Sequence, residues 1–242
     1  MSGAGAAACG VDVRLAMLAR SPLFTGLGDA ALGRVNERCR AEAMTPGGAV
    51  YRKGEPAESL YVVATGQLKL LEPTADGGEV VLDLCVPGSF LGGAPTLGDI
   101  AYPHEARALT HGCLLVLAAE VFEDIVRAEP EVALNALTLT ARRLREAQRT
   151  VQALSRQPVE AQLAATLARL AIRLGTPEAP ARRLELALSQ VDLAAMSGTT
   201  PESVSRTFGA WDRRGLIRRG RGWLEILDPE MLEALAEGDI PA

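Results

Sequence analysis

The chain has 242 residues, a length that accommodates two modest domains. Hydrophobic residues make up 48% of it and charged residues 23%, proportions that exclude an intrinsically disordered chain. The formal net charge of −5 excludes a protein that coats nucleic acid through an overall basic surface.

The sequence shows no sign of secretion or membrane insertion. Its apolar runs are all shorter than the roughly twenty residues of a membrane-spanning helix. The small-residue stretch 1–10 has no preceding positive charge and no apolar core after it, so no signal peptide is expected. The cysteines form neither a CxxC pair nor a disulfide framework: Cys9, Cys39, Cys85 and Cys113. We therefore expect a cytoplasmic protein that does not associate with a membrane.

Short helices followed by short strands are predicted for the first half of the chain. Residues 1–14 are expected to include a flexible N-terminus, and residues 11–43 carry apolar side chains at helical spacing with breaks at Ser21-Pro22 and at 26–29. From Met44 onward, β-prone runs alternate with Gly and Pro turns: residues 47–51, 60–64, 66–71, 79–84, 106–109 and 114–117. This pattern predicts an antiparallel sandwich or roll rather than alternating strands and helices.

A long helix is predicted after the strands. A short helix begins at Glu120, and Pro130 then opens a longer one that continues through Arg156. Apolar residues recur every seven positions along the longer helix, a spacing typical of a two-stranded coiled coil. The predicted dimer seam comprises Leu137, Ala141, Leu144, Val151 and Leu154. The alternative is that this stripe packs against the chain's own β domain.

Residues 188–216 have the pattern of two short helices joined by a tight turn. Ser189 is a hydroxyl N-cap, Gly198 permits a sharp corner, and Thr200 caps the second helix. In that helix, apolar residues recur at three- and four-residue spacing and are predicted to be buried: Val204, Phe208 and Trp211. This layout is that of a helix-turn-helix that presents polar residues of its second helix to DNA base edges. The alternative is a pair of ordinary packed helices in an α-rich domain.

A basic segment follows the second helix. Gly220 and Gly222 mark a turn between two β-prone runs, which predicts a small hairpin, or wing. The arginines of this segment are not separated by any acidic residue: Arg213, Arg214, Arg218, Arg219 and Arg221. Such a run is ordinarily a solvated face. Directly behind a candidate recognition helix, it predicts a patch that contacts DNA phosphates.

Four motifs carry a family resemblance. They are GEPAESLYVV with GQLKL (residues 54–63 and 66–70), PGSFLG (87–92) and TPESVSR (200–206). Together with the order of the predicted elements, they resemble the CRP/FNR superfamily of bacterial transcription regulators over about residues 18–235. The resemblance implies an α+β fold: an N-terminal antiparallel β-roll of the cyclic-nucleotide-binding jelly-roll type (15–129), a long dimerisation helix (130–157) and a C-terminal winged helix-turn-helix (158–242).

The same resemblance implies a transcription regulator, not an enzyme. Such a homodimer binds a palindromic site in double-stranded DNA and has RNA polymerase as a partner; activation and repression both remain open. The family's base-reading positions match Glu202, Ser205 and Arg206. Arg pairs with guanine and Glu accepts from cytosine, and the Glu-x-x-Ser-Arg pattern is similar to the FNR/DNR branch, which implies TTGA-type half-sites. The residues expected to hold the DNA backbone are Thr200, Ser203, Arg218, Arg219 and Arg221.

The expected effector pocket departs from that of the cAMP-binding members. Those members hold the ribose and the cyclic phosphate with a Phe-Gly-Glu segment and a downstream Arg-Ser pair, since an anion needs a cation or N–H donors. Here the corresponding positions are Gly92-Gly93, Tyr102-Pro103 and, on the long helix, Ala147 and Gln148. The one nearby cation is Arg107, whose alternative is an outward-facing strand residue. We therefore do not expect cAMP as a ligand.

Two other effectors occur in the family. FNR-like members hold an iron–sulfur cluster with four cysteine thiolates, three of them near the N-terminus, where this chain has only Cys9; a cluster is therefore not expected. DNR-like and CooA-like members sense NO or CO through haem, for which His is the usual axial ligand. The histidines are His104 and His111, so His104 is a candidate haem ligand, with an ordinary loop residue as the alternative. A ligand-free regulator controlled by its abundance is equally compatible.

Two functions of other classes are alternatives. A cupin-like β-roll enzyme would need a metal site built from histidines and carboxylates. His104, Glu105 and His111 are a sparse set for that purpose, so no metal is expected. A cyclic-nucleotide-gated adaptor would lack DNA binding, which a duplex shift assay distinguishes.

Overall fold

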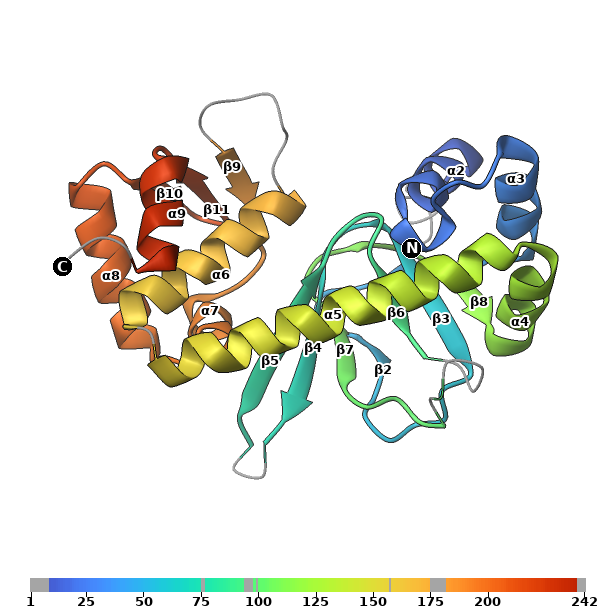
Figure 1. Ribbon diagram of the computed structural model, residues 1–242, viewed down its shortest axis with the longest axis horizontal. Helices are drawn as coiled ribbons and strands as arrows, with labels where there is room; N and C mark the ends of the chain where they lie inside the picture. The colour runs from blue at the N-terminus through green and yellow to red at the C-terminus, as the bar shows by residue number, and fades with distance from the viewer. Residues whose placement is uncertain are drawn as a thin grey trace. The chain divides into compact units, whose positions relative to one another are not determined.

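The computed structural model describes residues 9–74, 77–93, 98, 100–156, 158–174 and 182–238 (Figure 1). The chain divides into two compact units, one of Met1–Pro73 with Asp83–Arg145 and one of Thr74–Leu82 with Glu146–Ala242. The predicted α+β fold is confirmed: an antiparallel β-roll, a long helix, and a helix-turn-helix with a wing follow one another. Within the described ranges, no helix has the length and apolar character that crossing a membrane requires.

Short helical segments precede the roll, as the sequence predicts. Helix α2 (Val11–Arg20) is followed by a 3₁₀ turn (Pro22–Phe24) and by helix α3 (Asp29–Arg38). Because α2 begins at Val11, residues 11–14 are helical and do not belong to the flexible N-terminus that we predicted. Residues 1–8 lie outside the described part of the chain.

The N-terminal helical region ends before residue 43, where we had placed its end. Cys39 is extended, and strand β1 (Arg40–Met44) begins directly after it. This strand pairs antiparallel with β8 (Gly112–Ala118), and Met44 lies opposite Gly112. Hydrogen bonds to a strand about seventy residues away therefore decide the local conformation, because strand formation depends on the partner more than on intrinsic propensity.

The roll consists of two four-stranded antiparallel sheets. The first has the order β1-β8-β3-β6, in which β3 is Ser59–Thr65 and β6 is Phe90–Gly92. The second has the order β2-β7-β4-β5, with the bounds Ala49–Tyr51, Glu105–Ala108, Leu68–Pro73 and Glu79–Cys85. Strand β6 is missing from the sequence-based prediction, because three residues that end in a glycine form no recognisable period.

Strand β3 separates the two hydrophobic cores of the roll. Alternate side chains of a strand point to opposite faces. Leu60 and Val62 therefore join the core beneath the helices, which includes residues of α2, α3 and α4 (Ala119–Ala128). Tyr61 and Val63 face the space between the two sheets. Burial on both faces explains why the strand is apolar throughout rather than at every second position.

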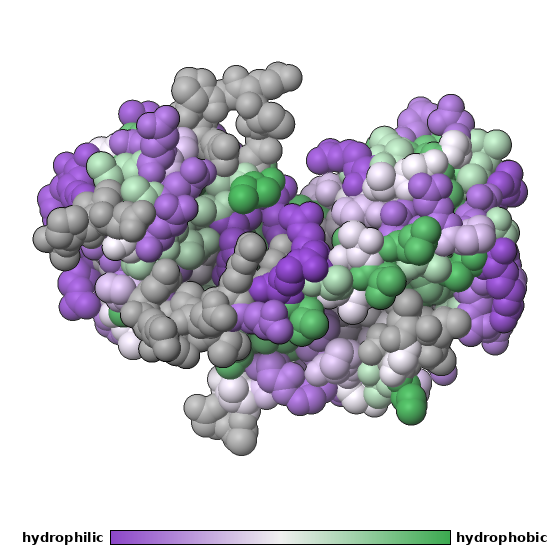
Figure 2. Space-filling model, in the orientation of Figure 1, coloured by the Kyte–Doolittle hydropathy of each residue, from purple (hydrophilic) through white to green (hydrophobic). Residues whose placement is uncertain are grey.

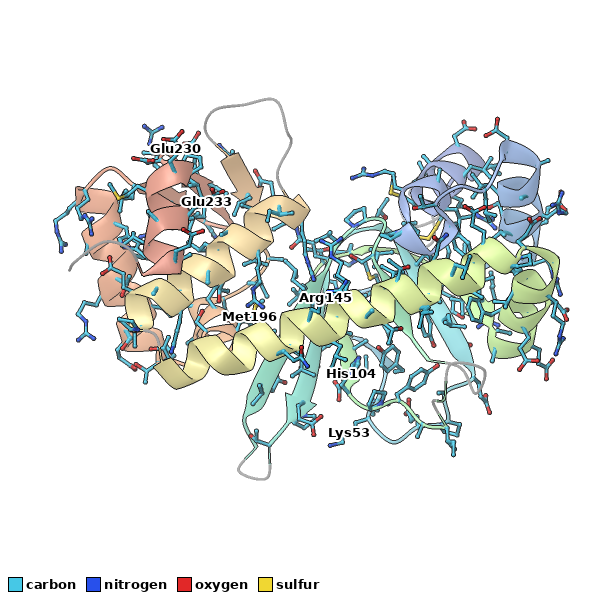
Figure 3. All side chains as sticks on the ribbon, in the orientation of Figure 1. Lys53, His104, Arg145, Met196, Glu230 and Glu233 are labelled. Carbon is cyan, nitrogen blue, oxygen red and sulfur yellow. A yellow bond between two sulfur atoms is a disulfide. The ribbon has the colours of Figure 1, made fainter. Side chains whose placement is uncertain are left out.

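The N-terminal segment is linked covalently to the roll. Cys9 and Cys113 form a disulfide, with Cα atoms 6.1 Å apart, that joins the start of the described chain to β8 (Figure 3). We predicted no disulfide framework; that prediction is wrong, because fold topology brings together residues 104 positions apart. Cys39 and Cys85 are buried and form no disulfide. Burial raises the pKa of the Cys39 thiol to about 12, against the opposing effect of the Arg14 guanidinium.

Helix α5 (Pro130–Arg156) has two different faces in the unit that contains the roll. Val132 and Ala136 are buried in the core beneath the helices. Asn135 fastens the first turns by donating from Nδ2 to the carbonyl oxygens of Leu23 at 3.1 Å and Thr25 at 2.8 Å. The exposed face carries leucines of which 60–67% of the surface is accessible: Leu134, Leu137 and Leu144.

The second unit holds the helix-turn-helix. Its helices are α6 (Val159–Leu174), α7 (Gln190–Met196), α8 (Pro201–Arg213) and α9 (Pro229–Glu237). Its sheet has the order β10-β11-β9, with the bounds Ile217–Gly220, Trp223–Ile226 and Arg182–Glu185. The apolar residues in 184–188 predict a strand there. Strand β9 begins two residues earlier, since its register is set by pairing with β11, where Glu185 faces Trp223.

We predict that reduction of the Cys9–Cys113 disulfide destabilises the first unit. The disulfide closes a loop with a sequence separation of 104 residues, so the chain-entropy effect is about 4–5 kcal/mol. The intact mass under non-reducing conditions should increase by two hydrogen atoms on reduction, and Cys9→Ser should lower the urea midpoint in non-reducing buffer. Cys85→Ser is the matched control, because Cys85 is not part of a disulfide. An unchanged mass on reduction would contradict the disulfide.

Candidate nucleic-acid interface and sensor pocket

Side-chain caps define the start of both helices of the helix-turn-helix, as predicted. In α7, the Ser189 hydroxyl accepts from the Asp192 N–H at 3.1 Å, and the Asp192 carboxylate accepts from the Ser189 N–H at 2.9 Å. Gly198 at the corner has φ +62°, which glycine tolerates best. In α8, the Thr200 hydroxyl accepts from the Ser203 N–H at 3.3 Å. The geometry of the turn is thus encoded within a few residues.

Helix α8 buries one face and exposes the other. The predicted apolar face is confirmed, since the accessible fractions are low: Val204 0%, Phe208 3% and Trp211 0%. The predicted base-reading residues, Glu202, Ser205 and Arg206, are all exposed. They occupy positions i, i+3 and i+4, which place them on one side of the first turns of the helix.

The polar contacts of this exposed face suit hydrogen bonding to bases. Glu202 accepts from its own backbone N–H and from the Thr200 hydroxyl, and both interactions lower the pKa of its carboxyl. It therefore remains an anion and an acceptor at neutral pH. The Arg206 guanidinium lies 3.5 Å from the Ser203 hydroxyl, a long contact that a better acceptor can replace.

The wing arginines differ in their surroundings. Arg218 is 3.4 Å from the Glu225 carboxylate across the hairpin, and its side chain is 65% exposed. The Arg219 guanidinium lies over the Phe208 ring, 5.8 Å from its centroid. Arg221 is exposed at the tip. Because exposed ion pairs contribute little, Arg218 can exchange Glu225 for a phosphate at small cost.

A stacked pair stabilises the wing. The Trp223 indole covers Gly220, where any Cβ would overlap the ring. On this indole lies the Arg183 guanidinium of β9, 4.4 Å from its centroid. Sequence analysis did not identify Arg183, because its proximity to the wing arises from the pairing of β9 with β11.

Aromatic side chains fill the predicted effector pocket. Tyr51 and Tyr102 stack with ring centroids 4.0 Å apart, and Tyr61 lies 5.6 Å from Tyr51. The Tyr102 hydroxyl donates to the Ser59 carbonyl oxygen at 3.0 Å and accepts from the Ser59 N–H at 3.1 Å. Burial raises the pKa of the Tyr51 and Tyr61 hydroxyls, so these groups are neutral at pH 7. Tyr51 was not predicted; a lone aromatic in a short strand gives no signal.

The remaining pocket residues do not form an anion site. The predicted cation, Arg107, donates from Nε and Nη2 to one oxygen of the buried Glu105, at 2.9 and 2.7 Å. Gly92 has φ +97°, and a Cβ there would lie 2.6 Å from the Ser59 carbonyl oxygen. The other predicted positions are a buried Gly93, an exposed Pro103, and Ala147 and Gln148, which are exposed on α5. Residues 94–97 and 99 lie outside the described residues.

The donor sets for metal cofactors are incomplete. In the part of the chain that the structure describes, no three His, Cys, Asp or Glu residues are grouped as a metal site requires. An iron–sulfur cluster needs four thiolates; in the structure Cys9 is bound to Cys113, and Cys39 and Cys85 are buried. The Nε2 atom of His104 (Figure 3) lies 3.4 Å from the Tyr51 hydroxyl, with the Tyr51 ring beside the imidazole. A haem iron held by this nitrogen would have to replace its contact with Tyr51.

Comparisons with known proteins identify the family. A cyclic nucleotide-binding domain matches residues 41–129, and a Crp-like helix-turn-helix domain matches residues 161–235. A cyclic AMP receptor protein from Thermus thermophilus is 31% identical over 218 residues, which cover 90% of this chain and 98% of that protein. The chain belongs to the CRP/FNR superfamily of transcription regulators. The regulator is also 27% identical to the transcriptional activator protein anr of Pseudomonas aeruginosa, over 83% of this chain and 82% of that one.

Solved structures agree with this assignment. FixK2 from Bradyrhizobium japonicum superposes on the CRP/FNR regulator with a TM-score of 0.74, covering 81% of this chain and 96% of that one. Its identity of 22% shows the fold alone. The Thermus thermophilus catabolite activator protein covers 90% of this chain and 99% of its own, with 31% identity and a TM-score of 0.52. Since these relatives are regulators, the cupin-like enzyme alternative is set aside and the regulator is not an enzyme.

Proposed function

We propose that the protein binds, as a homodimer, a palindromic DNA site with TTGA-type half-sites. The observation that carries this proposal is the single exposed face of α8 shared by Glu202, Ser205 and Arg206. A helix of this size fits the major groove, where the start of a recognition helix meets base edges. The TTGA preference rests on the similarity of these three residues to the FNR/DNR pattern.

Base reading and backbone contact are assigned to different residues. Arg206 pairs bidentately with a guanine, Glu202 accepts from a cytosine amino group, and Ser205 contacts a neighbouring base. The residues proposed to hold phosphates are Thr200, Ser203, Arg218, Arg219 and Arg221. Phosphate contacts position the protein without reading sequence. The net charge of −5 disfavours attachment of the protein to nucleic acid through its overall surface, so the positive charge that meets phosphates is the local group of arginines.

The proposed dimer forms through α5. Leu137 and Leu144, seven residues apart, are exposed, and Ala141 between them is partly buried. Figure 2, in the orientation of Figure 1, shows hydrophobic surface along the part of α5 that belongs to the first unit. An apolar stripe of this kind marks an interface when it is not covered. The side chains of Val151 and Leu154, the other proposed seam residues, lie outside the described ones.

The sensor domain is proposed to work without cAMP. Tyr102 occupies the position of the family's phosphate-binding arginine, and Arg107 is paired with Glu105. The activity of the regulator is therefore proposed to be controlled by the amount of the protein, or by a ligand of different chemistry. The haem alternative through His104 has no observation in its favour. RNA polymerase as a partner and a cytoplasmic location remain inferences from the family.

We predict that Arg206→Ala and Arg221→Ala weaken DNA binding in different ways. Loss of Arg206 should cost about 1–3 kcal/mol on a duplex with the matching guanine and relax preference at that base. Loss of Arg221 should weaken all duplexes alike and lower the salt slope by about one. Fluorescence anisotropy at several salt concentrations measures both. Equal loss on all duplexes for Arg206→Ala would contradict its base-reading role.

We predict that the double variant Leu137→Glu with Leu144→Glu is monomeric. Charged side chains in the seam would have to lose their hydration in the dimer, which costs several kcal/mol. Sedimentation equilibrium should give half the mass of the parent protein, and affinity for the palindrome should fall. Ile172→Glu is the matched control, because Ile172 is 70% exposed on α6 and lies outside the seam. An unchanged mass in the double variant would place the dimer interface elsewhere.

We predict that cAMP does not bind. The cyclic phosphate would meet no unpaired cation at the Tyr102 and Arg107 positions, and Tyr51 and Tyr102 fill the space between the sheets. Isothermal titration calorimetry should show no saturable heat, and cAMP should leave DNA affinity unchanged. The Thermus thermophilus cyclic AMP receptor protein serves as the positive control. Saturable heat would mean that cAMP binds and that the stacked rings of Tyr51 and Tyr102 separate to admit it. That result would refute the proposal.

A further inference from the structure

A carboxylate lies on the apolar face of α6. Glu160 is in the first turn, and positions i+3, i+4 and i+7 from it are Leu163, Ala164 and Leu167, each with an accessible fraction of 0%. These spacings define one side of a helix. A charged group on such a face is costly unless it is paired and hydrogen-bonded. Its partners therefore have to be found on the elements that pack against α6.

Both partners of Glu160 come from the recognition helix and the residue that caps it. The Trp211 indole Nε1–H donates to Glu160 Oε1 at 2.7 Å, and the Arg214 Nη1 atom lies 3.3 Å from the same oxygen. The Trp211 side chain is fully buried. The Glu160 side chain is 33% exposed, so the bond from the indole is a short, charge-assisted hydrogen bond in a partly buried position.

The hydrogen bond between Trp211 and Glu160 constrains the orientation of α8 in a way that its apolar contacts do not. Val204 and Phe208 hold the helix against its neighbours by hydrophobic burial, which is non-directional. A hydrogen bond requires alignment of donor and acceptor. Fixing Trp211 therefore fixes the rotation of α8 about its axis, and with it the direction in which Arg206 and Glu202 point.

A second polar contact joins α6 to the turn between α7 and α8. The Ser197 hydroxyl, at the end of α7, donates to the Thr166 hydroxyl of α6 at 3.0 Å, and both side chains are buried. Helix α6 thus anchors the turn before α8 through Thr166 and the end of α8 through Glu160. Hydrogen bonds from α6 therefore reach both the turn before the recognition helix and the last turn of that helix.

We propose that Glu160 is a positioning residue for DNA base reading, acting through Trp211 and Arg214. The inference rests on the proposed function, since it assumes that α8 reads bases. Glu160 touches no base in this role. It sets the orientation of the residues that do, and its loss should lower sequence discrimination more than it lowers general affinity for DNA.

The test compares three variants with the parent protein. Glu160→Ala removes the acceptor, Trp211→Phe removes the donor but keeps an aromatic ring, and Glu160→Gln retains an oxygen that accepts from the indole. We expect the ratio of affinities for a palindromic duplex and a scrambled duplex to fall about tenfold in the first two variants. Glu160→Gln should retain most of the ratio. Glu233→Ala, an exposed glutamate of α9 (Figure 3), is the control.

A second measurement tests the contact without DNA. In ¹H–¹⁵N spectra the protein has two indole resonances, from Trp211 and Trp223. Glu160→Ala should shift the Trp211 resonance, identified by its absence in Trp211→Phe, and leave that of Trp223 in place. An unmoved Trp211 resonance, or equal losses on both duplexes, would overturn the positioning role. If the parent protein does not discriminate the duplexes, the proposed function fails and this inference fails with it, even where the resonance moves.

Discussion

An α-helix that packs on a domain buries one face, and the residues on the buried face determine which residues are exposed on the opposite face. In α8, Val204, Phe208 and Trp211 occupy the buried face, so Glu202 and Arg206 are directed outward. The caps at Ser189 and Thr200 set where the two helices begin, and the left-handed Gly198 sets the corner between them. The proposed base reading depends on all of these features, because a change in the rotation or the starting residue of α8 would displace Glu202 and Arg206 together.

In the β-roll domain, burial affects the interior of the domain rather than an exposed face. An anion-binding pocket must keep a cation partly unpaired, which is costly in a low-dielectric interior. In this chain Arg107 donates to the buried Glu105, and the rings of Tyr51 and Tyr102 stack in the core between the two sheets. The result is a well-satisfied core between two sheets. A protein can thus retain the cyclic nucleotide-binding fold of its family while its pocket residues favour packing within the chain.

The organisation of the fold was largely predictable from the sequence, because its signals are local. Helix caps, the Pro at the start of α5 and the apolar spacing of α8 each involve residues within about four positions of one another. Strand β6 and the exact place of β9 were not predictable, since a three-residue strand has no period and the register of β9 depends on Trp223 in β11. For the same reason residues 40–43 were assigned to a helix, although their partner strand β8 makes them a strand.

The sequence by itself determined the family, the order of the elements, and the residues on the exposed face of the recognition helix. Only the tertiary structure decided the pairing of Cys9 with Cys113, the stacking of Tyr51 on Tyr102, and the contact of Glu160 with Trp211. These pairs are separated by about fifty to a hundred residues in the chain. Their contacts depend on sheet register and helix packing, which no window of neighbouring residues records. The local sequence therefore specifies which side chains each element carries, and long-range packing specifies which of those side chains are in contact.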